Sequence, residues 1–425
     1  MNLLTLLMIT IIIVAFFTRK TPYIIYLKSF LLPTICIAFI MLLIVFSNTA
    51  VESAQKGLNL WLKVVLPSLF PFFVASDILN KTGFIKTMGI LLEPVMRPLF
   101  NVPGCGSFAL AMGLTSGYPV GAKLASSMRK ENLLTKVESE RLLAFTNNSG
   151  PLFITGAVAV GMFKMPGLGV LLLGCHMLAS ITVGLLFRFY KKNSKSEKTI
   201  YHKDLIQKLT IDIKQSVNNT KFNLGKVLGD AIKNALEIML TVGGFIILFS
   251  VIIDILTKTG FILSLSNIVF TFLNSTSINK EIITALLSGF FEITTGADLA
   301  SRANTSFIQK LISVSIIMGW AGLSVHSQVY SIVSKTDISI KPYLLGKFLQ
   351  GIFAAIYIFL AIKITGLYST YSQPAFSTIN STSLSWYKYL HVSCYNLLMS
   401  IFIVILTAFI ILFFTTLKNK MLSSN

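Results

Sequence analysis

Polar and glycine residues interrupt an otherwise apolar segment at 113–123. The segment holds three glycines, a proline and a lysine, and the residues that could contact a solute are Ser116, Gly117, Tyr118, Pro119 and Lys123. In hydrocarbon, irregular backbone persists only where protein buries it or where it lines a wet cavity, because every N–H and C=O must be paired. The segment therefore predicts the tip of a re-entrant hairpin or a break in a discontinuous helix. Such breaks are where secondary transporters hold their substrates.

A second polar interruption lies at 146–153 and contains Asn147, Asn148, Ser149 and Gly150. Pro151 suits the first position of a new helix. Side chains that form hydrogen bonds need partners when they are embedded, because leaving them unpaired costs free energy. A bound substrate is one natural partner, and the alternative is a simple kink at a helix packing contact.

The second half of the chain offers a related set of residues, Glu292, Thr294, Thr295 and Gly296, within an apolar stretch. An isolated carboxylate there is costly unless it is paired, hydrated or protonated. Glu292 could take up a coupling proton or pair with Lys123, and Asp298 is an equally open partner for Lys123. The alternative for Lys123 is that its long side chain reaches to the membrane interface.

Farther on, Ser324, His326 and Gln328 are also candidates for substrate binding. His326 and Gln328 can donate hydrogen bonds to an aromatic nitrogen or a carboxylate, and histidine titrates near neutral pH. A histidine that is simply satisfied within a helix bundle is the alternative.

Two features are expected to be structural. Thr135 and Glu138 have the spacing of a capping box at the start of a helix. Arg141 is expected to form an ion pair with Glu138 or Glu140 on a helix face.

An internal repeat places these residues in two related units. Residues 77–85 match residues 254–262 at eight of nine positions, with an offset of 177. Ser116-Gly117 lines up with Ser288-Gly289 at an offset of 172, and so does Gly150 with Gly322. Paired units with Gly/Pro-interrupted apolar segments point to a transporter site. Inversion of the two repeats is the expected arrangement.

Composition sets the fold class. Over 425 residues, 54% are hydrophobic and 12% are charged, which predicts an all-α polytopic integral membrane protein with two internal repeats and broken helices. Soluble folding is excluded. The net charge of +20 does not indicate nucleic acid, because ten Lys/Arg against three acids fall in 188–226 and suit a cytoplasmic loop.

The sequence divides into five parts. We expect N-terminal spans at 1–50, a first transport repeat at 51–190, a basic cytoplasmic loop at 191–229, a second transport repeat at 230–366, and an extracytoplasmic loop with a C-terminal span at 367–425. Apolar runs that could form helices or spans stand at about 1–17, 30–46, 166–190, 238–256, 261–273, 281–291, 307–320, 343–366 and 397–416.

The motifs at 116–123, 140–151 and 322–329 together resemble the nucleoside-recognition Gate-domain family, and within it a group of sporulation membrane proteins. The resemblance covers about residues 30–366. It implies a transporter distantly similar to concentrative nucleoside transporters, in the membrane of an endospore-forming bacterium. It further implies transport of dipicolinate, pyridine-2,6-dicarboxylate, from the mother cell across the outer forespore membrane.

Three rival functions frame this expectation. A carrier of nucleosides or other small solutes belongs to the same class, whereas a non-transporting assembly protein of the forespore envelope belongs to another. A membrane enzyme is disfavoured, since the sequence has no paired-histidine metal motif, serine nucleophile elbow or phosphate-binding glycine loop. The expected partners are a small anionic aromatic substrate and the lipid bilayer, with no cofactor and no nucleic acid. A coupling proton or sodium ion and a homo-oligomer are left open.

Overall fold

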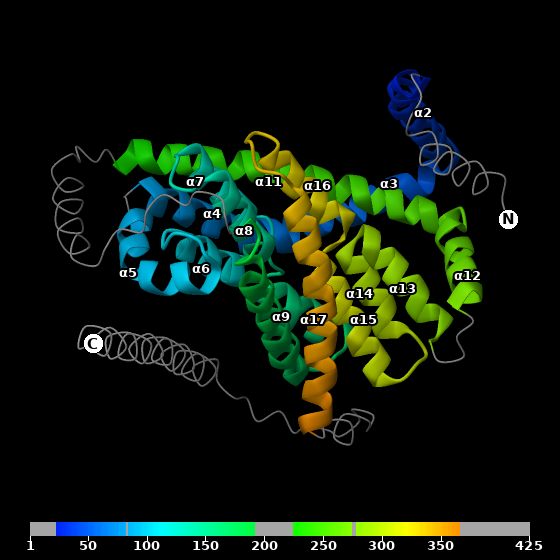
Figure 1. Ribbon diagram of the computed structural model, residues 1–425. Coiled ribbons are helices and arrows are strands. Elements are labelled where there is room, and N and C mark those ends of the chain that lie inside the picture. Colours follow the sequence, from blue (N-terminus) through cyan, green and yellow to red (C-terminus); the bar gives the residue numbers. More distant parts are fainter. Residues whose placement is uncertain (1–22, 82–83, 192–223, 274–277, 366–425) are drawn as a thin grey trace, which may run out of the picture. The chain divides into compact units, whose positions relative to one another are not determined.

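The computed structural model describes residues 23–81, 84–191, 224–273 and 278–365, all within one unit that ends at Tyr368. The regular structure of these residues is helical (Figure 1). The expected spans at 1–17 and 397–416, the loop at 368–395 and most of the basic loop lie outside the described residues.

The first half is a series of helices. In chain order they are α2 (Tyr23–Val45), α3 (Ser47–Leu60), the π-helical η1 (Trp61–Val65), α4 (Leu66–Lys81), α5 (Phe84–Phe100), α6 (Gly106–Ser116), α7 (Val120–Lys130), α8 (Lys136–Thr146), the π-helical η2 (Leu152–Met162) and α9 (Pro166–Phe187).

The second half follows the same plan. Its helices are α11 (Leu224–Lys258), α12 (Phe261–Leu273), α13 (Lys280–Phe291), α14 (Ile293–Arg302), α15 (Phe307–Trp320), α16 (Gly322–Val333) and α17 (Lys341–Thr365). The series α6, α7, α8, η2 and α9 therefore has its counterpart in α13 to α17. In the first series, a first break separates α6 from α7 and a second break separates α8 from η2. In the second series, the first break separates α13 from α14 and the second separates α15 from α16.

Four described helical segments are long and apolar enough to cross a membrane. They are Pro166–Phe187, Gly225–Lys258, Phe307–Val333 and Lys341–Ile364. The pair Pro33–Val45 and Ser47–Lys63, bent by 99°, is either a broken span or a re-entrant loop. The expectation of a polytopic helical membrane protein is confirmed.

Two prolines lie in α4. Pro71 is inside the helix, and η1 ends at Val65, two residues before Pro67, so the wider π turn lies next to the position where a proline N–H is missing from the helical ladder. The repeat alignment is corrected by three residues, because Gly289 lies inside α13 and the break that corresponds to Gly117 falls at Glu292.

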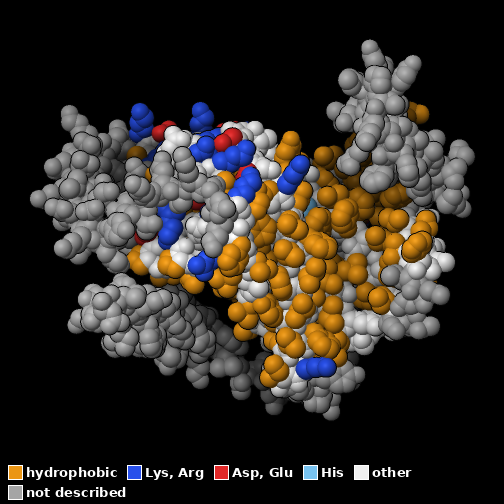
Figure 2. All heavy atoms as spheres, in the orientation of Figure 1, with side chains coloured by type: hydrophobic (Ala, Val, Ile, Leu, Met, Phe, Trp, Pro, Cys, Tyr) orange, Lys and Arg blue, Asp and Glu red, His pale blue; other side chains and the backbone are white. Residues whose placement is uncertain are grey.

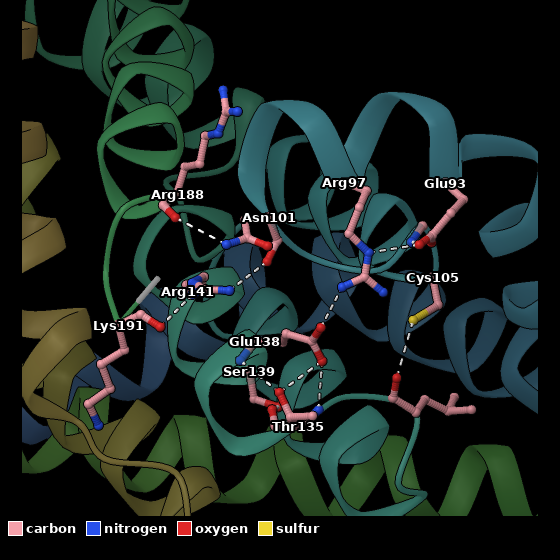
Figure 3. Close-up of polar contacts among 12 residues, drawn as sticks. Glu93, Arg97, Asn101, Cys105, Thr135, Glu138, Ser139, Arg141, Arg188 and Lys191 are labelled. Carbon is pink, nitrogen blue, oxygen red and sulfur yellow. Dashed lines mark hydrogen bonds and ion pairs between the residues drawn. The ribbon is translucent and has the colours of Figure 1, made fainter. Parts of the chain in front are cut away.

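Polar contacts fix α8 against α5 and α9 (Figure 3). The capping box of Thr135 and Glu138 is present, and Glu138 also accepts from Arg97 at 2.6 Å. Arg141 does not pair with an acid as expected. Its guanidinium donates to the carbonyl oxygens of Tyr190, Lys191 and Asn101 instead, and so satisfies carbonyls just beyond the end of α9 that have no helical partner.

The last described helix, α17, has an apolar outer face and a partly polar inner face. Its exposed positions include Leu345, Phe348, Ile352 and Ile356, and Figure 2 shows apolar side chains covering the face along which α17 runs. Its inner face packs on α15, α9 and α8. The helix thus faces lipid with its apolar side and turns a polar side toward the protein interior.

Candidate functional site

The two breaks of the first half touch each other. Gly117 lies between α6 and α7 with φ +96° and ψ −171°, a region that essentially only glycine occupies. A Cβ added there would lie 2.7 Å from the backbone nitrogen of Gly150 in the second break. Glycine at 117 and 150 therefore lets the two irregular segments meet.

A buried polar cluster surrounds the second of these breaks. We call it the Lys347 cluster, and its members come from the break between α8 and η2 and from α9, α16 and α17. They are Asn147, Asn148, His176, His326, Tyr343, Lys347 and Gln350, each at most 5% exposed.

Lys347 is the cation of this cluster and is fully buried. Its Nζ donates to the backbone oxygen of Asn147 at 2.7 Å and to Oε1 of Gln350 at 2.6 Å. It also lies 5.2 Å from the centroid of the Tyr118 ring, within the range of a cation–π contact. No carboxylate of a described residue lies within 4.0 Å of Nζ. A lysine buried without an anion is costly, so an ionisable residue at such a place makes the surrounding cluster a candidate functional site.

Gln350 connects Lys347 to α9 and to the break. Its Nε2 donates to Oδ1 of Asn148 at 2.8 Å and lies 3.3 Å from Nε2 of His176. The backbone N–H of Ser149 points to the same histidine nitrogen, also at 3.3 Å. Because two donors converge on Nε2 of His176, that nitrogen carries no proton and the ring is neutral. Asn148 donates to Phe145 O and to Ser180 Oγ as well, so its amide is fully engaged.

Tyr343 connects the break to α16. Its hydroxyl accepts from Nδ2 of Asn147 at 3.3 Å and lies 3.1 Å from Nδ1 of His326. With the tyrosine proton donated to Nδ1, His326 carries its proton on Nε2, a buried atom that has no partner here. Oδ1 of Asn147 is likewise buried without a partner. Nδ1 of His176, which carries the proton of that ring, is buried without a partner as well, so the cluster presents two spare donors and one spare acceptor beside Lys347.

The first break of the second half is closed by its own carboxylate. Glu292 accepts from the N–H groups of Thr294 and Thr295, at 2.9 and 2.7 Å, and from Oγ1 of Thr295 at 3.0 Å. The negative charge therefore sits on the N-terminus of α14, where the helix dipole favours it. Neither Glu292 nor Asp298 pairs with Lys123, contrary to expectation, and Asp298 instead pairs with Arg302 one turn later in α14.

Lys123 lies away from the Lys347 cluster, beside a separate cavity of about 260 Å³. Its Nζ is 3.7 Å from Oδ1 of Asp77, a residue that the sequence did not place in a site, and lies over the Phe73 ring. Gln328 lines the same cavity. It follows His326 by two positions on α16, so the two side chains point to nearly opposite sides of that helix.

The sequence missed the residues that carry most of the cluster. Tyr343, Lys347 and Gln350 lie on one face of a helix that was predicted as an apolar span, and their spacing of four and three residues is that of a single helical face. A lysine and an amide inside a span are a detectable signal. The described residues hold no group of three His, Cys, Asp or Glu side chains that could bind a metal ion.

Comparisons with known proteins identify the family. Residues 62–165 match the model of the Gate family, described as nucleoside recognition. The chain is 42% identical over 346 residues to the sporulation integral membrane protein YlbJ of Bacillus subtilis strain 168. The aligned residues cover 79% of this chain and 83% of that protein. This chain belongs to the YlbJ family. The segment that matches the Gate model contains α6, α7, α8 and both breaks of the first half.

Solved structures of CNTnw are also similar to this YlbJ-family chain. A CNTnw variant in the intermediate 3 state matches with 13% identity and a TM-score of 0.44, covering 84% of this chain and 91% of that one. CNTnw in an inward-facing substrate-bound state matches with 12% identity and the same TM-score, covering 82% and 90%.

Proposed function

We propose that this sporulation membrane protein is a carrier of dipicolinate, and that the Lys347 cluster holds the substrate. The observation that carries the proposal is the buried amino group of Lys347, which has no acid of the described residues beside it and whose charged form therefore gains its partner from a bound anion. An aromatic dicarboxylate supplies the missing negative charge. A neutral nucleoside does not.

The other groups of the cluster suit the rest of this substrate. Nε2–H of His326, which has no partner in the protein, can donate to the pyridine nitrogen or to a carboxylate oxygen. The ring of Tyr118 lies beside Lys347 and offers a face on which an aromatic ring can stack. The breaks at Ser116 to Pro119, Asn147 to Gly150 and Glu292 to Gly296 remain the proposed binding elements, together with Ser324, His326 and Gln328 of α16 and with Lys123 beside the second cavity.

The place of action is part of the proposal. The relative is named as a sporulation integral membrane protein, which supports a role in the sporulating cell. The family resemblance implies movement of dipicolinate from the mother cell toward the forespore. We place this chain in the outer forespore membrane and assign movement from the mother cell.

Uptake into proteoliposomes that contain the purified full chain tests the substrate. Labelled dipicolinate and labelled uridine are compared, each with an imposed proton or sodium gradient. We expect saturable dipicolinate uptake and no uridine uptake. Uridine uptake alone would replace this proposal with a nucleoside carrier, and no uptake of either solute under any gradient would favour the assembly protein.

The variant Lys347→Gln tests the site. A hydrogen bond to a charged group contributes about 1.5–3 kcal/mol, which corresponds to a roughly ten- to hundredfold loss of dipicolinate uptake at low substrate concentration. Lys341→Gln is the matched control, because Lys341 is exposed at the start of the same helix, and its uptake should equal that of the wild type. Equal uptake by Lys347→Gln would remove the cluster from the site.

A further inference from the structure

The surroundings of Lys347 fit both protonation forms of its side chain. Among the residues that the structure describes, two acceptors face Nζ, the backbone oxygen of Asn147 and Oε1 of Gln350. A neutral amine has two N–H groups and can satisfy both. The third position faces the ring of Tyr118, which stabilises a proton there by a cation–π contact and tolerates its loss.

The ionisable neighbours do not compete for this proton. His176 receives two donors on Nε2 and is neutral. His326 lies against Tyr343 and the ring of Trp320, and no carboxylate adjoins either ring among the described residues. Tyr118 and Tyr343 are neutral phenols at physiological pH.

The helices packed on α17 bring no counter-charge to Lys347. On α8, Glu138 pairs with Arg97 and Glu140 pairs with Lys191, while Arg141 binds backbone carbonyls. On α15, Lys310 donates to the backbone oxygen of Ser301. A bound anion is therefore the partner that can hold the charged form of Lys347 in place.

From this geometry we infer that Lys347 carries the coupling proton of transport. This inference rests on the proposed function. The ammonium accompanies the bound dianion, and after the dianion leaves, Nζ gives its proton to water on the release side. The empty carrier then returns with a neutral amine that still donates to Asn147 and Gln350. Each cycle moves one proton together with one dipicolinate.

Comparison of net uptake with exchange tests the inference. In proteoliposomes of the full chain, net dipicolinate uptake should rise when the outside is more acidic than the lumen. Exchange between labelled and unlabelled dipicolinate should not depend on that gradient, because a carrier that returns loaded need not release its proton. A sodium gradient should not drive net uptake.

The variant Lys347→Arg separates the two activities, because a guanidinium keeps its charge. We expect the ratio of net uptake to exchange to fall at least roughly tenfold, which corresponds to one pKa unit. Lys341→Arg is the matched control and should retain both activities. Net uptake by Lys347→Arg at the wild-type rate would overturn the inference, since the proton would then travel on a substrate carboxylate.

A measurement on the wild type does not depend on how the variant folds. A pH-sensitive dye in the lumen should report one proton entering with each dipicolinate. Dipicolinate uptake with no proton entry, or uptake driven by sodium alone, would overturn this inference while leaving the dipicolinate carrier intact. Absence of dipicolinate movement would instead remove the proposed function.

Discussion

The first breaks of the two halves differ in what covers the N-terminus of the helix that follows. In the second half, the carboxylate of Glu292 accepts from two N–H groups of α14. In the first half, α7 follows Gly117, Tyr118 and Pro119 and has no side-chain cap. The N-terminus of α14 in the second half is thus covered by a carboxylate of the protein itself, whereas the N-terminus of α7 in the first half has no side-chain cap.

The second breaks differ in a complementary way. The first half places Asn147, Asn148 and Ser149 in its break, while the second half turns directly from Ala321, with φ +78°, into α16. The cation and three further polar groups that meet this break of the first half, Tyr343, Gln350 and His326, come from α16 and α17 of the second half, whereas His176 comes from α9 of the first half. One half thus provides the irregular backbone and the other the cation.

Corresponding arginines show the same divergence. Arg302 pairs within α14 with Asp298, whereas Arg129 at the end of α7 reaches Asp337, which precedes α17. The first-half arginine joins the two halves and the second-half arginine does not.

Glycine substitutions at the breaks should give the largest effects. Gly117→Ala places a Cβ 2.7 Å from the backbone of Gly150 at a backbone conformation reserved for glycine, so we expect a loss of about 2–4 kcal/mol of stability. In Gly322→Ala, the atom nearest to the added Cβ is Phe291 O at 3.0 Å, so we expect a smaller loss of stability. Thermal unfolding in detergent measures both.

The control is Gly174→Ala in α9, where no atom lies within 4 Å of an added Cβ. Alanine favours a helix over glycine by about 0.5–1 kcal/mol, so this variant should unfold at the same or a higher temperature. If Gly322→Ala were the more damaging change, the first half would not be the more tightly constrained of the two.

The sequence predicted the breaks because they depend on local chemistry. Glycine, proline and amides inside apolar runs located both irregular segments of the first half, and the capping box of Thr135 and Glu138 formed as its spacing indicated. The repeat was also visible, although its alignment at Ser288-Gly289 was wrong by three residues. The sequence alignment paired identical residues there, whereas the structural correspondence pairs the positions at which the helices end.

The partners of charged residues could not be predicted from the sequence. Lys123 was expected to meet Glu292 or Asp298, yet it pairs with Asp77, and Glu292 caps its own helix. Such pairings depend on how distant helices pack, which local patterns do not determine. Lys347 was missed for another reason, since an apolar average over 343–366 conceals three polar residues on one helical face.

Tyr343→Phe tests whether the two halves cooperate in the site. The change removes the hydroxyl that joins Asn147 of the first half to His326 of the second and leaves the ring in place. A neutral hydrogen bond contributes about 0.5–1.5 kcal/mol, so the KM for dipicolinate should rise roughly two- to tenfold. Tyr330→Phe on the exposed side of α16 should leave KM unchanged. An equal KM in both variants would show that the halves act separately.

Asp337→Asn tests the ion pair between the halves and should give the smallest effect. Arg129 donates to both oxygens of Asp337, at 2.8 and 3.0 Å, and these hydrogen bonds hold the pKa of the Asp337 carboxyl below its ordinary value of 3.8. The pair is largely exposed, so its contribution is about 0.2–1 kcal/mol. Because the folded-state pKa is lowered, this stability is present above the unfolded-state pKa and is lost as the pH falls through the folded value.

The unfolding temperature of the wild type should therefore exceed that of Asp337→Asn at neutral pH, and the two unfolding temperatures should converge as the pH falls through the lowered folded-state pKa of Asp337. Arg129→Gln should remove the same pH-dependent difference, since it takes away the other partner. A difference in unfolding temperature that persists at low pH would mean that Asp337 acts through packing rather than charge. The contrast with Arg302 would then no longer reflect an ion pair that joins the two halves.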